Sequence, residues 1–383
     1  MNTDGKIKVL FITDKAHLYG DNKSLLTTLC SLDSSVERLV CVTQLGLFTD
    51  ELSAAHIPFQ LIEGTMTPLF MPISLKHKWL HKLLNYPIYI RKKIKTRKQL
   101  SQIIRNYKPD IIHSNNGFIY AGAIMSEQYS IPHVWHLREY ITLDHNTTIP
   151  SPRFFSKARK KSHCIAITRG LFEHWELTTP KDTHIYNGMF QAKSIPEYQE
   201  EKGKNFLFLG RILKTKGIEE LLQAFSEFAK TNTTFKLRIV GDGEEAYVKS
   251  LKDILRQNHI EDRVEFAGFH KDVRPYLQSA YALIVPSKFE AMGRITAEAM
   301  MLGCLVIGRN TGGTKELLEY EQAGLLYDDT EGLTKAMSTV ANYDELQLKE
   351  RNLRARSTAL AHYSAENNAK QVYEFYKSIL NLC

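Results

Sequence analysis

Short apolar runs alternate with longer amphipathic segments along most of the chain. The runs are rich in Val, Ile, Leu and Phe, as buried parallel strands are, and the segments between them have the apolar spacing of helices. The first series of expected strands is 7–13, 38–43, 59–63, 110–115, 133–137, 163–168 and 183–187. The second series is 205–210, 236–240, 264–267, 281–285, 304–308 and 324–327. This alternation predicts an α/β protein with parallel sheets covered by helices on both faces.

A polar stretch, 191–204, separates the two series of strands. It contains Pro196 and Gly203 and has no apolar periodicity, as expected of a linker. The length of 383 residues also suits two domains. We therefore expect two Rossmann-like domains facing each other across a cleft, the first over 1–190 and the second over 205–363.

The end of the chain has a continuous helical pattern from 331 to 380. We expect the C-terminal helix, 364–383, to pack back on the first domain.

Ligands of open parallel sheets bind beyond the carboxyl ends of the strands. The expected site therefore lies in the cleft.

The positive charge of the chain is concentrated in one segment. The chain holds 50 Lys and Arg against 42 Asp and Glu, a formal charge of +8, with 43% apolar and 24% charged residues overall, as in a globular protein. The segment 71–110 holds eleven Lys or Arg and one acid, Asp110, so it carries +10 and the remainder carries −2. The basicity is therefore a local property.

Aromatic and aliphatic residues interleave with the basic residues of this segment, and Pro87 is expected to interrupt it. Apolar anchors beside positive charge are typical of contact with an anionic membrane, which we expect through Lys76–Lys108. The alternative is an ordinary helix pair, with its apolar face in the core and its lysines in water, above all over 89–107. The apolar residues are Trp79, Leu80, Leu83, Leu84, Tyr86, Ile88, Tyr89 and Ile90.

Other features indicate a cytoplasmic protein, peripheral on the inner face of the membrane. No apolar run approaches the ~20 residues that span a bilayer. The five cysteines are scattered and odd in number, without zinc-like spacing, as in a reduced intracellular protein. No nucleic-acid-binding module is recognisable, so nucleic acid is not an expected partner.

The most informative stretch for chemistry is 286–303. A loop after strand 281–285 carries Glu290 and Gly293, and a helix is expected from Arg294. A helix start beyond a parallel strand binds phosphate, and the two carboxylates, Glu290 and Glu298, suit sugar and ribose hydroxyls at either end of such a ligand. The alternative is that both acids are solvated surface residues.

Three further strand-to-helix junctions have the composition of phosphate sites. Arg211 and Lys216 follow strand 205–210 and suit a pyrophosphate. Gly241 and Gly243 form a glycine-rich turn after the next strand, and a third junction lies at 311–316. Each junction alone is weak evidence, because Gly-x-Gly is often only a tight turn.

In this order, the motifs resemble the nucleotide-sugar domain of retaining GT-B glycosyltransferases, specifically glycosyltransferase family 4, the glycosyl transferases group 1. The resemblance covers about 205 to 330. The matching pieces are Gly210-Arg211, Lys216-Gly217, Val240-Gly241-Asp242-Gly243, Phe266-Ala267-Gly268, Glu290, Glu298-Ala299-Met300, Gly303, Gly312-Gly313 and Glu316.

This resemblance implies transfer of a sugar from a UDP- or GDP-linked donor to an acceptor hydroxyl, with retained configuration. It assigns Glu290 to donor-sugar hydroxyls and Glu298 to ribose hydroxyls, and places Met292 where members often have phenylalanine. The catalytic residues it implies are Glu290, Arg211, Lys216 and His136. The donor site it implies comprises Gly20, Arg211, Lys216, Gly241, Gly243, Glu290, Met292, Gly293, Arg294 and Glu298.

The first half matches the family more loosely. Gly20 fits the family's glycine loop after the first strand, whereas Asp21 stands where a second glycine is common. His136 matches a position close to the reacting sugar. The alternative for such a histidine at a strand end is a structural hydrogen bond. The candidates on the acceptor side are His113, Asn115, Arg138 and Glu139.

No Asp-x-Asp occurs in the chain, so the metal motif of the other major glycosyltransferase architecture is absent. Arg211, Lys216 and the helix start at Gly293 are expected to neutralise the departing diphosphate, without a metal or other cofactor. By resemblance, the acceptor is lipid-linked or an oligosaccharide in bacterial surface polysaccharide synthesis, such as capsule, O-antigen or exopolysaccharide. The rival readings are a sugar-nucleotide epimerase of the same architecture and a basic nucleic-acid-binding protein.

Overall fold

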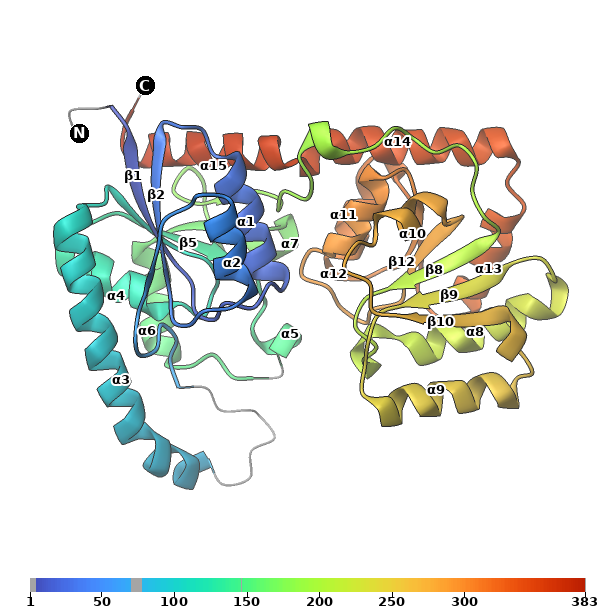
Figure 1. Ribbon diagram of the computed structural model, residues 1–383, viewed down its shortest axis with the longest axis horizontal. Coiled ribbons are helices and arrows are strands. Elements are labelled where there is room, and N and C mark those ends of the chain that lie inside the picture. The colour runs from blue at the N-terminus through green and yellow to red at the C-terminus, as the bar shows by residue number, and fades with distance from the viewer. Residues whose placement is uncertain (1–4, 70–77, 146, 383) are drawn as a thin grey trace. The chain divides into compact units, whose positions relative to one another are not determined.

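The computed structural model describes residues 5–69, 78–145 and 147–382. The chain divides into two compact units (Figure 1). The first unit comprises Met1–Gly188 and Ala365–Cys383, and the second unit comprises Met189–Ser364. Residues 191–204, expected as a linker, fall within the second unit and hold a short 3-10 helix, η1 (Ala192–Ser194).

The first unit contains a parallel sheet in the order β3-β2-β1-β4-β5-β6-β7. The order reverses between β1 and β4, so the carboxyl ends of these two strands form a switch point, where ligands of such sheets bind. The strands are β1 (Ile7–Ile12), β2 (Val36–Val42), β3 (Phe59–Leu61), β4 (Ile111–Ser114), β5 (His133–Leu137), β6 (His163–Ala166) and β7 (Thr183–His184).

Helices cover both faces of this sheet because successive side chains of a strand point to opposite sides. Val9 and Phe11 of β1 join the core on the side of α1, α2 and α15, whereas Leu10 and Ile12 join the core on the side of α3 and α4. The helices of the unit are α1 (Gly20–Ser31), α2 (Leu47–Ala54), α3 (Lys78–Tyr107), α4 (Tyr120–Tyr129), α5 (Thr142–His145), α6 (Pro152–Lys161), α7 (Arg169–His174) and α15 (Ala365–Ile379).

Helix α3 corrects one sequence prediction. Pro87 was expected to interrupt the basic segment, but it lies inside α3. A proline removes one hydrogen bond from the helix, and the turns on either side keep theirs. Part of the basic segment, 71–77 with Lys76, lies outside the described residues.

The second unit contains a parallel sheet in the order β10-β9-β8-β11-β12-β13, with its switch point between β8 and β11. Its strands are β8 (Asn205–Leu209), β9 (Lys236–Val240), β10 (Val264–Gly268), β11 (Ala282–Val285), β12 (Leu305–Arg309) and β13 (Leu325–Tyr327). Each expected strand of both series coincides with an observed one, so the predicted α/β class is confirmed.

One face of the second sheet is packed with phenylalanine. Phe206 and Phe208 of β8 meet Phe225 and Phe228 of α8 in a fully buried cluster. The α-helices are α8 (Ile218–Thr231), α9 (Glu245–Gln257), α10 (Arg274–Ser279), α11 (Arg294–Met301), α12 (Gly312–Glu319), α13 (Thr330–Ala341) and α14 (Glu345–Tyr363). The further 3-10 helices are η2 (Lys214–Lys216), η3 (Glu261–Arg263) and η4 (Tyr320–Gln322).

The C-terminal helix α15 returns to the first unit. Val372 and Tyr376 are fully buried in the core shared with α1, and Thr28 of α1 donates a hydrogen bond of 2.7 Å to Asn368. Within the described residues, no helix combines the length and apolarity needed to cross a bilayer.

Candidate active site

The loop after β11 is held in place by the start of α12. The backbone N–H of Gly313 donates to the carbonyl of Glu290 at 2.8 Å. A Cβ on Gly313 would lie 2.4 Å from the Cα of Met292, and one on Gly312 would lie 2.5 Å from the carbonyl oxygen of Glu290. The two glycines therefore permit the close approach that fixes the Glu290 loop.

Lys216 and Glu290 form an ion pair across the switch point of this sheet. Lys216 Nζ lies 2.5 Å from Glu290 Oε1, and the two side chains are 26% and 19% exposed. Lys216 follows β8 and Glu290 follows β11, the two strands between which the order reverses. Gly217 brings these loops together, because a Cβ there would overlap the carbonyl of Pro286. The structure thus joins two site residues predicted from separate motifs.

Helix α11 begins beside this ion pair. Gly293, at its N-cap, has a left-handed backbone with φ of 79°. Arg294 donates to Glu298 Oε1 at 3.0 Å, one turn further along, and Glu298 is buried. Arg294 thus supplies a positively charged partner for the buried carboxylate of Glu298.

Two buried hydroxyls near Gly293 were missed by the sequence analysis. Thr296 Oγ1 and Thr314 Oγ1 would lie 3.2 and 3.3 Å from a Cβ built on Gly293. Neither hydroxyl has a hydrogen-bond partner among the described residues. Buried polar groups normally have partners, so these hydroxyls are candidate ligand contacts. A threonine inside a helix pattern gives no sequence signal for this, because it occurs there for many reasons.

The glycines after β9 pack against the loop after β8. A Cβ on Gly241 would overlap the carbonyl of Gly210, and one on Gly243 would lie 2.5 Å from the carbonyl of Ile212. Ile212 N–H donates to the carbonyl of Asp242 at 2.6 Å. These glycines therefore let two loops meet and position the chain at Arg211, whose side chain is exposed.

A second constellation lies at the switch point of the first unit. Arg138 Nε donates to the backbone carbonyl of Asn115 at 2.8 Å, and Arg138 Nη1 donates to Asn187 Oδ1. His136 Nδ1 contacts His113 Nε2 at 3.2 Å and Arg138 Nη2 at 3.3 Å. The structure thus brings together the predicted residues His113, Asn115, His136 and Arg138, all of them buried.

The two histidines of this constellation are neutral. Burial, followed by the positive charge of Arg138, lowers the pKa of both His113 and His136 well below the ordinary value. Burial also raises the pKa of Tyr376, whose hydroxyl lies 2.5 Å from His113 Nδ1. These rings therefore act in hydrogen bonding without a positive charge.

The start of α1 joins the same switch point. Asn22 accepts a hydrogen bond of 2.8 Å from Thr13, which follows β1, and one of 3.3 Å from Asn115. Gly20, the first residue of α1, is exposed. Glu139, expected on the acceptor side, accepts a hydrogen bond of 3.1 Å from the Gly117 backbone and so holds the loop after β4.

Residues 190–356 match the family described as Glycosyl transferases group 1. This match covers most of the second unit and less than half of the chain. The chain is 29% identical to N-acetyl-alpha-D-glucosaminyl L-malate synthase from Bacillus anthracis, over 52% of each chain, so it matches about half of that relative's length. It is 26% identical to alpha-monoglucosyldiacylglycerol synthase from Streptococcus pneumoniae, over 72% of this chain and 68% of that one.

The chain shares its fold with HepE from Anabaena, solved in complex with UDP and glucose. The TM-score is 0.76 with 21% identity, over 97% of this chain and 100% of the HepE chain. The predicted GT-B fold is confirmed by this likeness.

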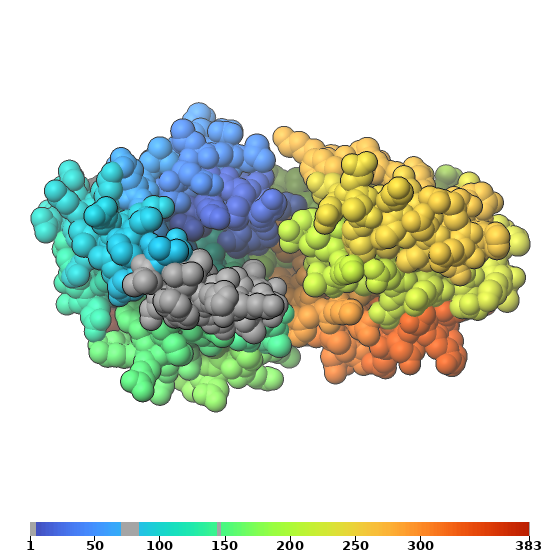
Figure 2. Space-filling view, turned by 90° about the horizontal axis from the view of Figure 1, so that it is seen from below, coloured from blue at the N-terminus to red at the C-terminus, as the bar shows by residue number. Residues whose placement is uncertain are grey.

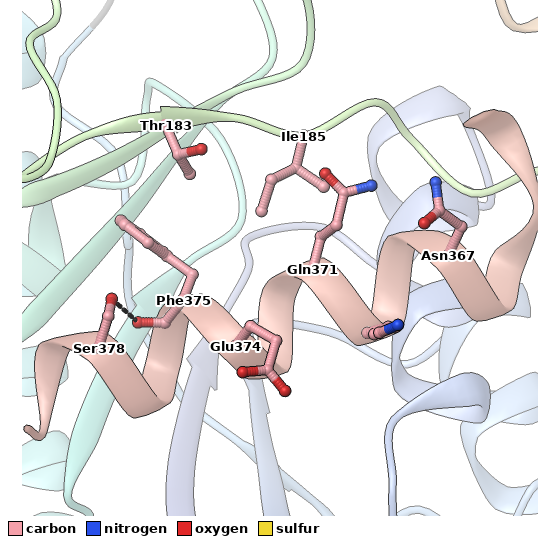
Figure 3. A pocket seen from close by; sticks show the side chains of 8 residues that line it. Thr183, Ile185, Asn367, Gln371, Glu374, Phe375 and Ser378 are labelled. Carbon is pink, nitrogen blue, oxygen red and sulfur yellow. Dashed lines mark hydrogen bonds between the residues drawn. The ribbon is translucent and has the colours of Figure 1, made fainter. Parts of the chain in front are cut away.

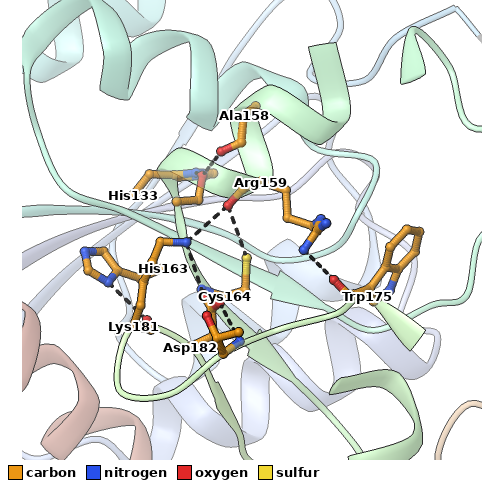
Figure 4. A network of polar contacts seen from close by, with 10 residues as sticks. His133, Ala158, Arg159, His163, Cys164, Trp175, Lys181 and Asp182 are labelled. Carbon is orange, nitrogen blue, oxygen red and sulfur yellow. Dashed lines mark hydrogen bonds and ion pairs between the residues drawn. The ribbon is translucent and has the colours of Figure 1, made fainter. Parts of the chain in front are cut away.

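A separate polar network in the first unit has a structural role (Figure 4). Asp182 accepts hydrogen bonds from the backbone of Cys164, at 2.9 Å, and of Thr178, at 3.1 Å, and so ties β6 to the chain before β7. Arg159 of α6 donates to the carbonyl of Trp175. No predicted site residue belongs to this network.

A pocket of about 450 Å³ also lies in the first unit, beside β7 (Figure 3). Its lining contains none of the predicted site residues. The side chains come from β7, the segment after it and α15, and comprise Thr183, Ile185, Asn367, Lys370, Gln371, Glu374, Phe375 and Ser378.

Proposed function

We propose that the protein transfers a sugar from a UDP- or GDP-linked donor to an acceptor hydroxyl with retention of configuration. The observation that carries this proposal is the Lys216–Glu290 ion pair beside the start of α11, at the switch point of a group 1 glycosyltransferase domain. Positively charged side chains and the free backbone amides of a helix start bind a diphosphate. Carboxylates on either side of it accept hydrogen bonds from the hydroxyls of a sugar and a ribose.

In this proposal the cationic groups stabilise the departing diphosphate. Negative charge grows on the phosphate as its oxygen separates from the anomeric carbon of the sugar. The groups that stabilise this charge are Lys216, Arg211 and the N-terminus of α11 at Gly293 and Arg294. The acceptor oxygen bonds to that carbon on the same face. Its proton passes to the leaving phosphate, so no protein base takes part. The reaction in this form needs no metal ion.

The carboxylates orient the donor at its two ends. Glu290, partly exposed beside Lys216, accepts hydrogen bonds from donor-sugar hydroxyls. Glu298, buried beside Arg294, accepts them from the ribose. The Gly20 backbone contacts a donor phosphate and His136 contacts the sugar, while Arg138 and Asn115 organise the acceptor side.

A screen of UDP- and GDP-sugars by thermal shift tests this function. A ligand that binds only the folded state stabilises it, by about 2.7 kcal/mol at a hundred times its Kd. We expect at least one nucleotide sugar to raise the melting temperature, and mass spectrometry with a hydroxyl acceptor to show donor loss coupled to a heavier product. An isomerised sugar nucleotide without a heavier product would indicate the epimerase instead.

Turnover in EDTA tests independence from metal. We expect the rate to be unchanged, because Lys216 and Arg211 supply the positive charge. Loss of turnover that magnesium or manganese restores would contradict this part of the proposal.

We further propose that the acceptor is a lipid-linked or oligosaccharide intermediate of bacterial surface polysaccharide synthesis, reached at the inner face of the cytoplasmic membrane. Support comes from α3, part of which lies at the surface of the first unit (cyan in Figure 2). Leu84 and Ile88 are 64% and 54% exposed, and Arg91, Lys92 and Lys93 are exposed beside them. One relative carries diacylglycerol in its name.

The alternative of an ordinary core helix holds for the other half of α3. Leu100, Ile103 and Ile104 are buried against the sheet, as the apolar side chains of any helix that covers a sheet are. Among the side chains that the structure describes, the apolar and basic surface therefore covers about 84–98. Exposed apolar residues interleaved with positive charge favour an anionic lipid surface over nucleic acid, which requires no apolar anchors.

A further inference from the structure

A chain of hydrogen bonds connects the C-terminal helix to His136. The Tyr376 hydroxyl of α15 lies 2.5 Å from His113 Nδ1. His113 Nε2 lies 3.2 Å from His136 Nδ1, and Arg138 Nη2 lies 3.3 Å from the same atom. His136 Nε2 is buried and has no hydrogen-bond partner among the described residues.

The guanidinium group determines where the protons of this chain lie. Arginine has donors and no acceptor, so His136 Nδ1, which contacts Arg138, is the acceptor and carries no proton. Since burial keeps His136 neutral, its proton lies on Nε2. His113 Nε2, facing the same acceptor, must then donate. His113 Nδ1 is left as an acceptor, so Tyr376 donates to it.

We infer that Tyr376, His113 and Arg138 are positioning residues that hold His136 in the Nε2–H tautomer, so that His136 donates a hydrogen bond to a ligand oxygen. This inference rests on the proposed function and deepens it by giving His136 the role of donor and excluding the role of base. The matching ligand atom is an acceptor oxygen, as in a sugar hydroxyl or a phosphate. A buried N–H without a partner is costly, and such an oxygen satisfies it.

A neighbouring histidine shows the contrasting, purely structural arrangement. His133, at the start of β5, has partners on both ring nitrogens: Ser162 Oγ at 2.7 Å from Nδ1 and Ser114 Oγ at 2.9 Å from Nε2. The Ser162 hydroxyl itself donates a hydrogen bond of 2.8 Å to the carbonyl of Ala158. His133 is therefore satisfied within the fold, whereas His136 keeps one donor for a ligand.

NMR of the full-length protein with isotope-labelled histidine nitrogen tests the tautomer directly, without any activity measurement. Resonances of His136 are identified by their loss in His136→Gln or by backbone assignment. We expect a neutral ring with its proton on Nε2 in the wild type. A proton on Nδ1, or a charged ring at neutral pH, overturns the inference.

Tyr376→Phe tests the role of the tyrosine. Without the Tyr376 donor, His113 keeps only one of the two contacts that favour its Nε2–H form, and we expect its nitrogen resonances to show a mixture of tautomers. In the transfer reaction kcat should fall about two- to tenfold, the value of one hydrogen bond. Tyr107→Phe is the matched control, because the Tyr107 hydroxyl is buried without a partner among the described residues and its removal breaks no hydrogen bond. Unchanged His113 resonances in Tyr376→Phe contradict the positioning role.

Two substitutions at His136 separate a donor from a base. Glutamine offers an amide N–H but no basic nitrogen, so His136→Gln should stay within about tenfold of the wild-type rate while His136→Ala loses about a hundredfold. Equal and larger losses in both variants indicate a base and overturn the inference. If the wild type transfers no sugar, the proposed function fails, and the NMR result still decides the tautomer on its own.

Discussion

At the scale of single residues, the candidate site depends on charged side chains that lie close together without being deeply buried. Lys216 and Glu290 are each about a fifth to a quarter exposed, so their pairing adds little to stability. Their geometry instead leaves Glu290 able to exchange its lysine contact for ligand hydroxyls. Such a pair is expected to matter for activity and hardly at all for folding.

Glu290→Ala tests this distinction. We expect kcat/KM for sugar transfer to fall about ten- to a hundredfold, because a hydrogen bond to a charged group is lost. The free energy of unfolding should change by less than about 1 kcal/mol, since the ion pair is partly exposed. Steady-state kinetics and urea unfolding give the two values.

Glu227→Ala is the matched control for Glu290→Ala. Glu227 pairs with Lys230 at 2.7 Å on the exposed face of α8, in the same unit. The Glu227→Ala substitution should leave both the rate of sugar transfer and the free energy of unfolding nearly unchanged. A Glu290→Ala variant with full activity and intact fold would remove Glu290 from the site.

At the scale of elements, α3 combines two surfaces in one helix. Its C-terminal half contributes Leu100 and Ile104 to the core, while Leu84, Ile88 and Ile94 are exposed nearer its start. The helix is thus anchored at one end and presents an apolar and basic surface at the other. Substitutions at the exposed end of α3 should therefore change this surface without disturbing the core of the unit.

Replacing Arg91, Lys92 and Lys93 by glutamine tests the membrane surface. Each basic residue near an anionic membrane contributes about 1 kcal/mol, so binding to anionic liposomes should weaken by about a hundredfold. Transfer to a soluble acceptor should be unaffected, because none of these three residues belongs to the candidate site. Liposome co-sedimentation at low salt measures the binding.

A second triple variant, Lys230, Lys335 and Lys349 to glutamine, removes the same charge from exposed positions of the second unit. It should bind liposomes as the wild type does. Equal weakening in both variants would mean that only net charge matters. Binding of duplex DNA in preference to liposomes would favour the nucleic-acid alternative.

At the scale of the whole molecule, buried histidines make stability depend on pH. Burial is the largest cause that lowers the pKa of His113, His133 and His136, for His133 to about 3. These rings stay neutral in the folded state and take up protons in the unfolded state near the ordinary value of about 6.5. Protonation therefore favours unfolding.

The free energy of unfolding should be constant above a pH of about 6.5 and decline below it, by up to about 1.4 kcal/mol per pH unit for each histidine. Tryptophan fluorescence in urea measures this for the first unit, since Trp79, Trp135 and Trp175 all belong to it. His133→Asn should reduce the slope, whereas replacement of the exposed His270 in the second unit should not. A flat profile from pH about 7.5 to 5.5 would exclude this linkage.

Much of the fold was predictable because it depends on local pattern. Apolar runs between amphipathic segments specify strands and helices. Gly293 marks a junction with a left-handed backbone, and Gly312 marks one where a Cβ would meet the carbonyl oxygen of Glu290. Motif order was enough to predict that Lys216 and Glu290 lie close together, since they follow strands that adjoin at the switch point. The prediction that Pro87 interrupts the basic segment was wrong because one proline leaves the rest of a long helix intact.

By itself, the sequence determined the class of fold, the positions of the strands and the charged residues that follow them in the second unit, because these depend on short-range periodicity and spacing. Only the tertiary structure decided which distant groups meet. Tyr376 reaches His113 from the other end of the chain, and Thr296 and Thr314 leave buried hydroxyls near Gly293. Partners and burial depend on packing between elements, and no local pattern encodes them.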